Sequence, residues 1–126
     1  MNREILFRGK ADDEWVYGDL GRLKNAITIT KRNFIYPYIV MPETVGQFTG
    51  LTDKNGVKIF EGDIVTVPNI SDDEYGIVKF DNDGAMFIVE FDTFTVDFGN
   101  NIDSNQCKII GNIFDNPELL KGEENE

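Results

Sequence analysis

Few residues of this chain could carry chemistry, because the sequence contains no histidine and a single cysteine. Without imidazole, a Ser-His or Cys-His nucleophile pair cannot form, and zinc sites with histidine ligands are excluded. Ser71 and Ser104 lie in polar stretches that we expect to be loops. Cys107 directly precedes an expected strand, with no second thiol or base to activate it. We therefore expect it to fill the boundary of the core, with no catalytic or redox role.

The closest approach to a metal motif is the stretch 79–90, which nearly fits the twelve-residue loop of an EF-hand. The third, fifth, sixth and twelfth places of that loop hold Asp81, Asp83, Gly84 and Glu90. The first place requires an aspartate but holds Lys79, and the flanking residues favour strands over helices. The stretch therefore predicts a β-hairpin without a metal ion.

Two further patterns are weak as ligand sites. Residues 18–21 space two glycines, but they lack the third glycine and the strand-to-helix context of a phosphate loop. Trp15 and Tyr17 could stack on a ligand or base. Their spacing of two places both on one face of a strand, which we expect to face the core.

Acidic pairs for glycosidase-type chemistry exist, but nothing singles one out. We therefore predict no catalytic, cofactor-binding or metal-binding residues and leave binding residues unassigned.

The elements that position these residues are predominantly strands. Short alternating apolar stretches are separated by Gly, Asn and Asp, which is typical of β-strands and turns. The sequence predicts strands at about 5–8, 15–18, 26–30, 34–40, 57–60, 64–67, 76–80, 86–91, 93–98 and 108–114. Pro37 marks its strand as an edge or bent strand. Residues 53–56 predict a tight turn, residues 42–45 a helical turn, and residues 116–120 the start of a short terminal helix.

Length and charge limit the classes of function. A chain of 126 residues fits one domain. Residues 1–60 contain nine Lys/Arg and seven Asp/Glu, and residues 61–126 contain three and sixteen, giving balances of +2 and −13. An acidic field of this kind repels phosphate, so nucleic-acid binding through the second half is not expected. The basic residues of the first quarter are interpreted as solvated strand edges.

The compartment also follows from composition. The one cysteine and the absence of a signal-peptide pattern indicate a reducing cytoplasm. No apolar run approaches the length needed to span a bilayer, so we predict no membrane contact.

Several stretches, in order along the chain, resemble the YopX family of bacteriophage and prophage proteins. The opening is similar in REILFRGK (3–10) and WVYG (15–18). The most distinctive match is ETVGQFTGLTDKNG (43–56), which continues through KIFEGDIV (58–65). The ending IGNIFDNPELL (110–120) is similar too, whereas residues 69–105 carry no signature.

The resemblance implies a fold like a small SH3-like barrel and no established activity. We expect an all-β fold: a partly open SH3-like barrel over about 46–115, with an N-terminal β extension and a short C-terminal helix. Residues 1–120 are expected to form one YopX-like domain, and residues 121–126 a charged flexible tail.

The expected function is that of a non-catalytic accessory protein of a phage or prophage, in the host cytoplasm, that binds a protein partner or self-associates. One alternative is a nucleic-acid-associated regulator that uses the basic N-terminal quarter. Another is an acidic mimic of nucleic acid that acts on a host protein. No cofactor is expected, and any small-molecule ligand is unassigned. A homo-oligomer is compatible with the expected exposed strand edges.

Overall fold

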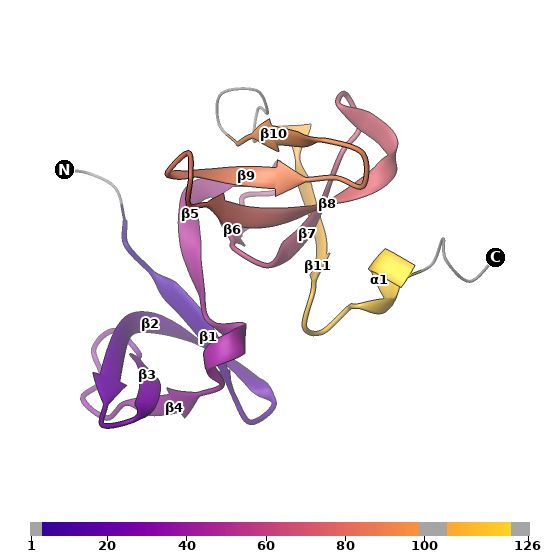
Figure 1. Ribbon diagram of the computed structural model, residues 1–126. Coiled ribbons are helices and arrows are strands. Elements are labelled where there is room, and N and C mark those ends of the chain that lie inside the picture. Colours follow the sequence, from indigo (N-terminus) through magenta and orange to yellow (C-terminus); the bar gives the residue numbers. More distant parts are fainter. Residues whose placement is uncertain (1–3, 99–105, 122–126) are drawn as a thin grey trace. The chain divides into compact units, whose positions relative to one another are not determined.

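The computed structural model of the chain describes residues 4–98 and 106–121 (Figure 1). The chain divides into two compact units, Met1–Gly50 and Leu51–Glu126. The division falls close to residue 46, where the sequence predicts the start of the barrel core. One domain over 1–120 stays a prediction, and residues 122–126 of the expected tail lie outside the described residues.

Strands make up most of both units. The first unit contains β1 (Phe7–Ala11), β2 (Glu14–Leu23), β3 (Ala26–Thr30), β4 (Tyr38–Val40), the 3₁₀ turn η1 (Pro42–Thr44) and most of β5 (Gly46–Thr52). The second contains β6 (Lys58–Phe60), β7 (Asp63–Val67), β8 (Ser71–Asp81), β9 (Met86–Glu90), β10 (Thr95–Asp97), β11 (Lys108–Asn112) and α1 (Glu118–Lys121). The expected helical turn at 42–45 and the expected terminal helix are therefore confirmed.

Within the described residues the strands form two antiparallel sheets and no closed barrel. The six-stranded sheet has the order β4-β3-β2-β1-β5-β6, and the five-stranded sheet has the order β10-β9-β8-β7-β11. The all-β prediction is thus confirmed, whereas the partly open SH3-like barrel over about 46–115 stays a prediction. β4 ends the first of these orders, as expected of an edge strand, but it begins only at Tyr38, so residues 34–37 of the expected strand, Pro37 included, lie outside it.

Each unit has its own apolar core. In the first unit, Val16, Ile29 and Val40 are buried together. Gly9 permits this packing, because a Cβ atom there would lie 3.0 Å from Cγ2 of Val40 and 3.2 Å from Cδ1 of Ile29. The second unit has a larger core, formed by Ile59, Val65, Val67, Val78, Val89, Phe91, Phe98 and Cys107.

Some strand boundaries differ from those that the sequence predicts. The first strand starts two residues late, because Ile5 is exposed and precedes β1. β2 extends the strand expected at 15–18 through Gly21 to Leu23. Gly18 is required there, since a Cβ atom would lie 2.0 Å from the backbone oxygen of Thr30. Ser71 and the acidic run after it lie in β8 and not in a loop.

Candidate functional site

The most conspicuous surface feature is a run of exposed apolar and aromatic side chains that we name the 34–41 segment. Its members are Phe34, Ile35, Tyr36, Tyr38, Ile39 and Met41. Ile35 is 81% exposed, Tyr36 78% and Ile39 63%, far more than a side chain that serves the core. Isolated exposed apolar residues are ordinary, but a contiguous group of this kind is a candidate interaction surface.

Buried contacts hold the 34–41 segment in place at its C-terminal end. Val40 is 3% exposed and lies in the core of the first unit. The next residue, Met41, donates its backbone N–H to the carbonyl oxygen of Lys10 at 2.8 Å. The hydroxyl of Thr44 donates to the carbonyl oxygen of Met41 at 2.6 Å and accepts the backbone N–H of Lys10 at 2.9 Å.

The N-terminal end of the segment is fixed by a turn and by a lysine. Phe34 donates its backbone N–H to the carbonyl oxygen of Lys31 at 3.0 Å. The Lys31 ammonium lies 5.8 Å from the ring centre of Phe34 and 5.0 Å from that of Tyr38. Both distances lie within the range of cation–π attraction. The fold therefore displays these side chains from an ordered edge strand and the turn before it.

From the sequence we assign no binding residues, so this exposed surface is not predicted. The signal that could have found it is the run FIYPYI, in which apolar residues follow one another without alternation. A strand with one face buried alternates, whereas this run does not, and only its last two residues, Tyr38 and Ile39, lie in β4.

Trp15 and Tyr17 do not face the core as the sequence predicts. Val16, between them, takes the core position of β2. Trp15 is half-buried under two cations: the Arg8 guanidinium lies 4.6 Å from its ring centre and the Lys10 ammonium 5.5 Å. The cause is register, because β1 places Lys10 opposite Trp15 and Arg8 opposite Tyr17 on one face of the sheet.

The basic residues of the first quarter are only partly the solvated strand edges that the sequence predicts. Arg8 is 5% exposed, so this prediction is wrong for that residue. Arg32 is held by an ion pair to Glu4 at 3.6 Å, another to Asp19 at 3.3 Å, and a hydrogen bond to the carbonyl oxygen of Ile5. Arg3 lies outside the described residues. Arg22 and Lys24 are exposed.

Cys107 is fully buried in the core of the second unit. Burial, and then the carboxylates of Asp53 and Asp63, raise the pKa of its thiol from 9.0 to about 12. A thiol of this kind is protonated at neutral pH, and the thiolate is the reactive form. The location thus agrees with a packing role.

The hairpin predicted at 79–90 is confirmed. β8 and β9 pair from Ile77–Glu90 to Asp81–Met86, and the turn lies between them. Lys79 forms an ion pair with Glu90, so the residues in the first and twelfth places of the apparent calcium loop bind each other. In the part of the chain that the structure describes, no three acidic or thiol side chains are placed to hold a metal ion. Ser104 lies outside that part.

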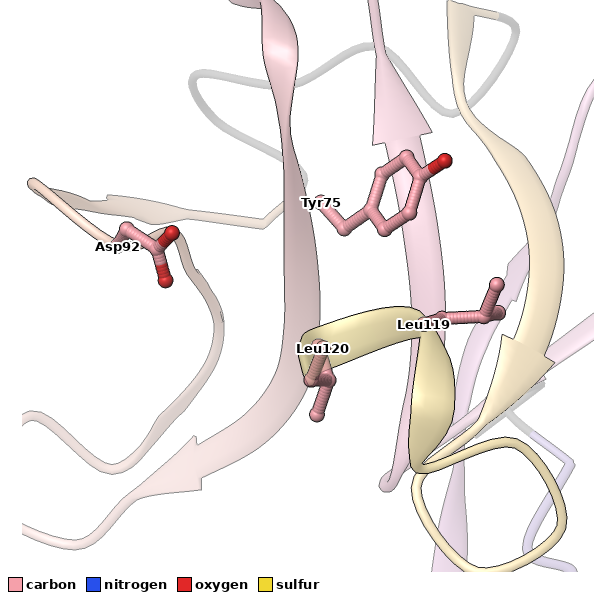
Figure 2. Close-up of a pocket in the computed structure, with 4 residues that line it drawn as sticks. All are labelled: Tyr75, Asp92, Leu119 and Leu120. Carbon is pink, nitrogen blue, oxygen red and sulfur yellow. The ribbon is translucent and has the colours of Figure 1, made fainter. Parts of the chain in front are cut away.

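A shallow hollow lies in the second unit, lined by Tyr75, Asp92, Leu119 and Leu120 (Figure 2). It has room for about one water molecule. Small-molecule sites enclose about 300 to 1,000 Å³, so the hollow is too small for an organic ligand.

The residues of the most distinctive motif have structural roles. Asp53 is 4% exposed, and its Oδ1 accepts the backbone N–H groups of Asn55 at 2.9 Å and Val57 at 3.0 Å. Its Oδ2 accepts the backbone N–H of Ile109 in β11 at 3.0 Å. Burial by itself would raise the pKa of Asp53, but these hydrogen bonds, with the charge of Lys108, lower it below the ordinary value of 3.8. The carboxylate thus fastens the 53–56 turn to a distant strand.

A second polar network closes the C-terminal motif. Oδ1 of Asn112 accepts the backbone N–H groups of Phe114 at 3.0 Å and Asp115 at 2.9 Å. Asn116 accepts the backbone N–H of Asn112 through its side chain at 3.1 Å, and it donates its own backbone N–H to the carbonyl oxygen of Asn112 at 2.8 Å. These bonds place α1 after β11, so this motif also serves the fold.

Together these observations define an all-β protein of two antiparallel sheets, whose most distinctive sequence motifs build turns and which exposes an apolar segment at β4 and directly before it. The sequence signature of the YopX protein family matches residues 5–121. The chain belongs to the YopX family. A comparison with curated proteins finds none that matches. Among the described residues, no helix is both long and apolar enough to cross a membrane.

Proposed function

We propose that the protein is a non-catalytic binding module that contacts a protein surface through the 34–41 segment. The exposure of Ile39 on the edge strand β4, and of Ile35 and Tyr36 in the segment directly before it, is the observation that carries the proposal. Aromatic residues are enriched at protein interfaces, because they bury a large area at a small entropic cost. An edge strand also offers backbone groups with which a partner strand can pair.

Within this proposal, the protein acts as an accessory protein of a phage or prophage in the cytoplasm of its host. It performs no reaction of its own. A partly open SH3-like barrel over about residues 46–115 would suit this role, since small barrels of this type often serve as binding modules. Fold alone does not establish the role, so the proposal depends on the exposed segment.

The test compares three immobilised proteins in lysate from prophage-bearing or infected host cells. They are the wild type, the variant Ile35→Asp/Tyr36→Asp, and a control, Val57→Asp, which places one charge on an exposed apolar residue of the other unit. Proteins retained by the wild type and the control but lost from the segment variant would support the proposal. Equal retention by all three would overturn it. Near-ultraviolet circular dichroism of each variant establishes that its tertiary packing is intact.

A second candidate is binding of single-stranded nucleic acid, which is favoured by cations beside aromatic rings. Lys31 lies against Phe34 and Tyr38, and Arg8 and Lys10 flank Trp15. Stacking platforms with adjacent cations bind single strands. The net charge of −11 opposes this function. A mobility-shift assay with a labelled single strand at about physiological salt tests it.

The acidic-mimic hypothesis depends on the charge of the second unit. Residues 51–126 contain seventeen Asp/Glu and five Lys/Arg, a balance of −12. Competition between this protein and DNA for a nucleic-acid-binding host protein would support mimicry.

A further inference from the structure

The surroundings of the 34–41 segment are positively charged. Residues 20–42 contain no Asp or Glu, and they contain the four cations Arg22, Lys24, Lys31 and Arg32. Arg32 is already paired with Glu4 and Asp19. Lys31 lies directly against two rings of the segment. A partner that fits this surface therefore combines apolar or aromatic groups with negative charge.

The charge argues against contact between two copies of the segment. A symmetric antiparallel pairing of β4 with the β4 of another copy would place the Lys31 end of each copy beside the Lys24 end of the other, cation beside cation. Like charges brought together at an interface cost free energy and disfavour the complex. The partner surface must therefore differ from the segment itself.

The second unit of this same chain offers the complementary chemistry. Asp72 and Asp73 are exposed at the start of β8, and Tyr75 beside them is 42% exposed. Register explains their display: Ser71 pairs with Val67 and Gly76 with Val65, so the residues between protrude from the ladder.

Acids and rings continue next to this bulge. Asp92 lines the same hollow as Tyr75 (Figure 2). Phe94 is 37% exposed and stacked on Phe91. The carboxylate of Glu74 accepts hydrogen bonds from the backbone N–H and the hydroxyl of Thr93. Asp72 and Asp73 remain exposed. We name residues 71–75 the acidic bulge.

We propose that the occupant of the 34–41 segment is a second copy of this chain, which binds through its acidic bulge. This inference rests on the proposed binding function and names its partner. Lys31 and Arg22 of one copy would meet Asp72 and Asp73 of the other, while Phe34 and Tyr38 pack against Tyr75. Because the two contacting surfaces differ, the contact is head-to-tail and extends to rings or short chains.

The test is sedimentation velocity over a range of concentrations, with charge reversal on each side. The cation variant is Arg22→Glu/Lys31→Glu, and the acid variant is Asp72→Lys/Asp73→Lys. The control Lys54→Glu/Lys58→Glu changes the net charge as much as the cation variant does, but at exposed positions of the second unit. We expect the wild type and the control to associate, and each reversed variant to weaken association at least tenfold. An equimolar mixture of the two reversed variants should regain it.

A wild type that stays monomeric at hundreds of micromolar overturns the inference, because a specific contact with a millimolar Kd is worth only about 4 kcal/mol. Self-association that neither charge-reversal variant weakens would also overturn the inference. In either case, segment-dependent capture from lysate would leave the proposed function standing with another partner. A single strand bound through Lys31 with the wild type monomeric would identify nucleic acid as the occupant and also overturn the inference. Thermal unfolding of each variant establishes that it is folded.

Discussion

Oδ2 of Asp53 accepts the backbone N–H of Ile109 at 3.0 Å, although the two residues lie 56 positions apart in the chain. In the same contact, the backbone N–H of Lys54 donates to the carbonyl oxygen of Cys107 at 2.9 Å. The turn at 53–56 is therefore attached to β11 and its approach through both side chain and backbone. This attachment explains why a motif that resembles a simple turn signal contains a buried carboxylate.

The first prediction concerns the pH dependence of this attachment. Because the pKa of Asp53 is lower in the folded than in the unfolded state, its stabilising contribution is present above about pH 4 and is lost as the pH falls through the folded pKa. Asp53→Asn should lower the free energy of unfolding at pH 7 by about 1 to 3 kcal/mol. It should also flatten the dependence of stability on pH below about pH 4. Urea unfolding at several pH values measures both effects.

The control for this experiment is Asp13→Asn, which alters an exposed acid in the turn between β1 and β2. It should leave the free energy of unfolding within about 0.5 kcal/mol of the wild type. An Asp53→Asn variant as stable as this control would contradict the assigned role of the carboxylate.

The second prediction concerns the thiol of Cys107. Its pKa of about 12, compared with 9.0 for an ordinary cysteine, lowers the thiolate population near pH 8 by about a thousandfold. Full burial adds a steric barrier. We expect Ellman's reagent to react with the native protein no faster than the protein unfolds, and rapidly in denaturing urea. Rapid reaction of the native protein would show that the thiol is accessible.

The third prediction concerns the coupling of Gly111 with Asn116. A Cβ atom on Gly111 would lie 2.6 Å from Oδ1 of Asn116, the atom that accepts the backbone N–H of Asn112. Gly111→Ala should therefore lower the free energy of unfolding of the wild type by about 1 to 3 kcal/mol. The loss of stability should be smaller in an Asn116→Ala background, where the contacts with Oδ1 and Cγ are removed and only the contact with Cβ of residue 116, at 3.0 Å, remains. Chemical denaturation of the two single variants and the double variant gives the coupling energy, and strict additivity would rule out the contact.

The fourth prediction concerns calcium. Lys79→Asp supplies the missing first ligand of the apparent EF-hand loop, yet the variant should not gain micromolar calcium affinity. The reason is that β8 and β9 hold residues 79–81 and 86–90 in an extended ladder, whereas an EF-hand loop wraps around its ion. Calorimetric titration with calcium tests this, and saturable binding at micromolar concentration would refute it. Loss of the exposed ion pair with Glu90 should lower the free energy of unfolding by less than about 1 kcal/mol.

Local sequence determined much of the fold. Alternating apolar residues identified most strands, Pro42 marked the 3₁₀ turn, and Asn116 and Pro117 marked the start of α1. Gly56 has a φ of 82°, the left-handed geometry that its turn requires. These features depend on residues within a few positions of each other, so a short window of sequence contains their physical cause. The YopX resemblance followed from the same local motifs in their order.

Tertiary structure decided which faces are buried and which surfaces remain exposed. Trp15 and Val16 are neighbouring apolar residues in β2. The pairing of β1 with β2 places Val16 in the core and the ring of Trp15 against Arg8 and Lys10. The run at 34–39 has the composition of a buried strand. It remains exposed because Phe34, Ile35 and Tyr36 precede β4 outside any strand, and β4 itself ends its sheet in the described chain. Whether a residue is buried depends on strands that lie far away in the sequence. A single sequence does not show which of these strands will pair.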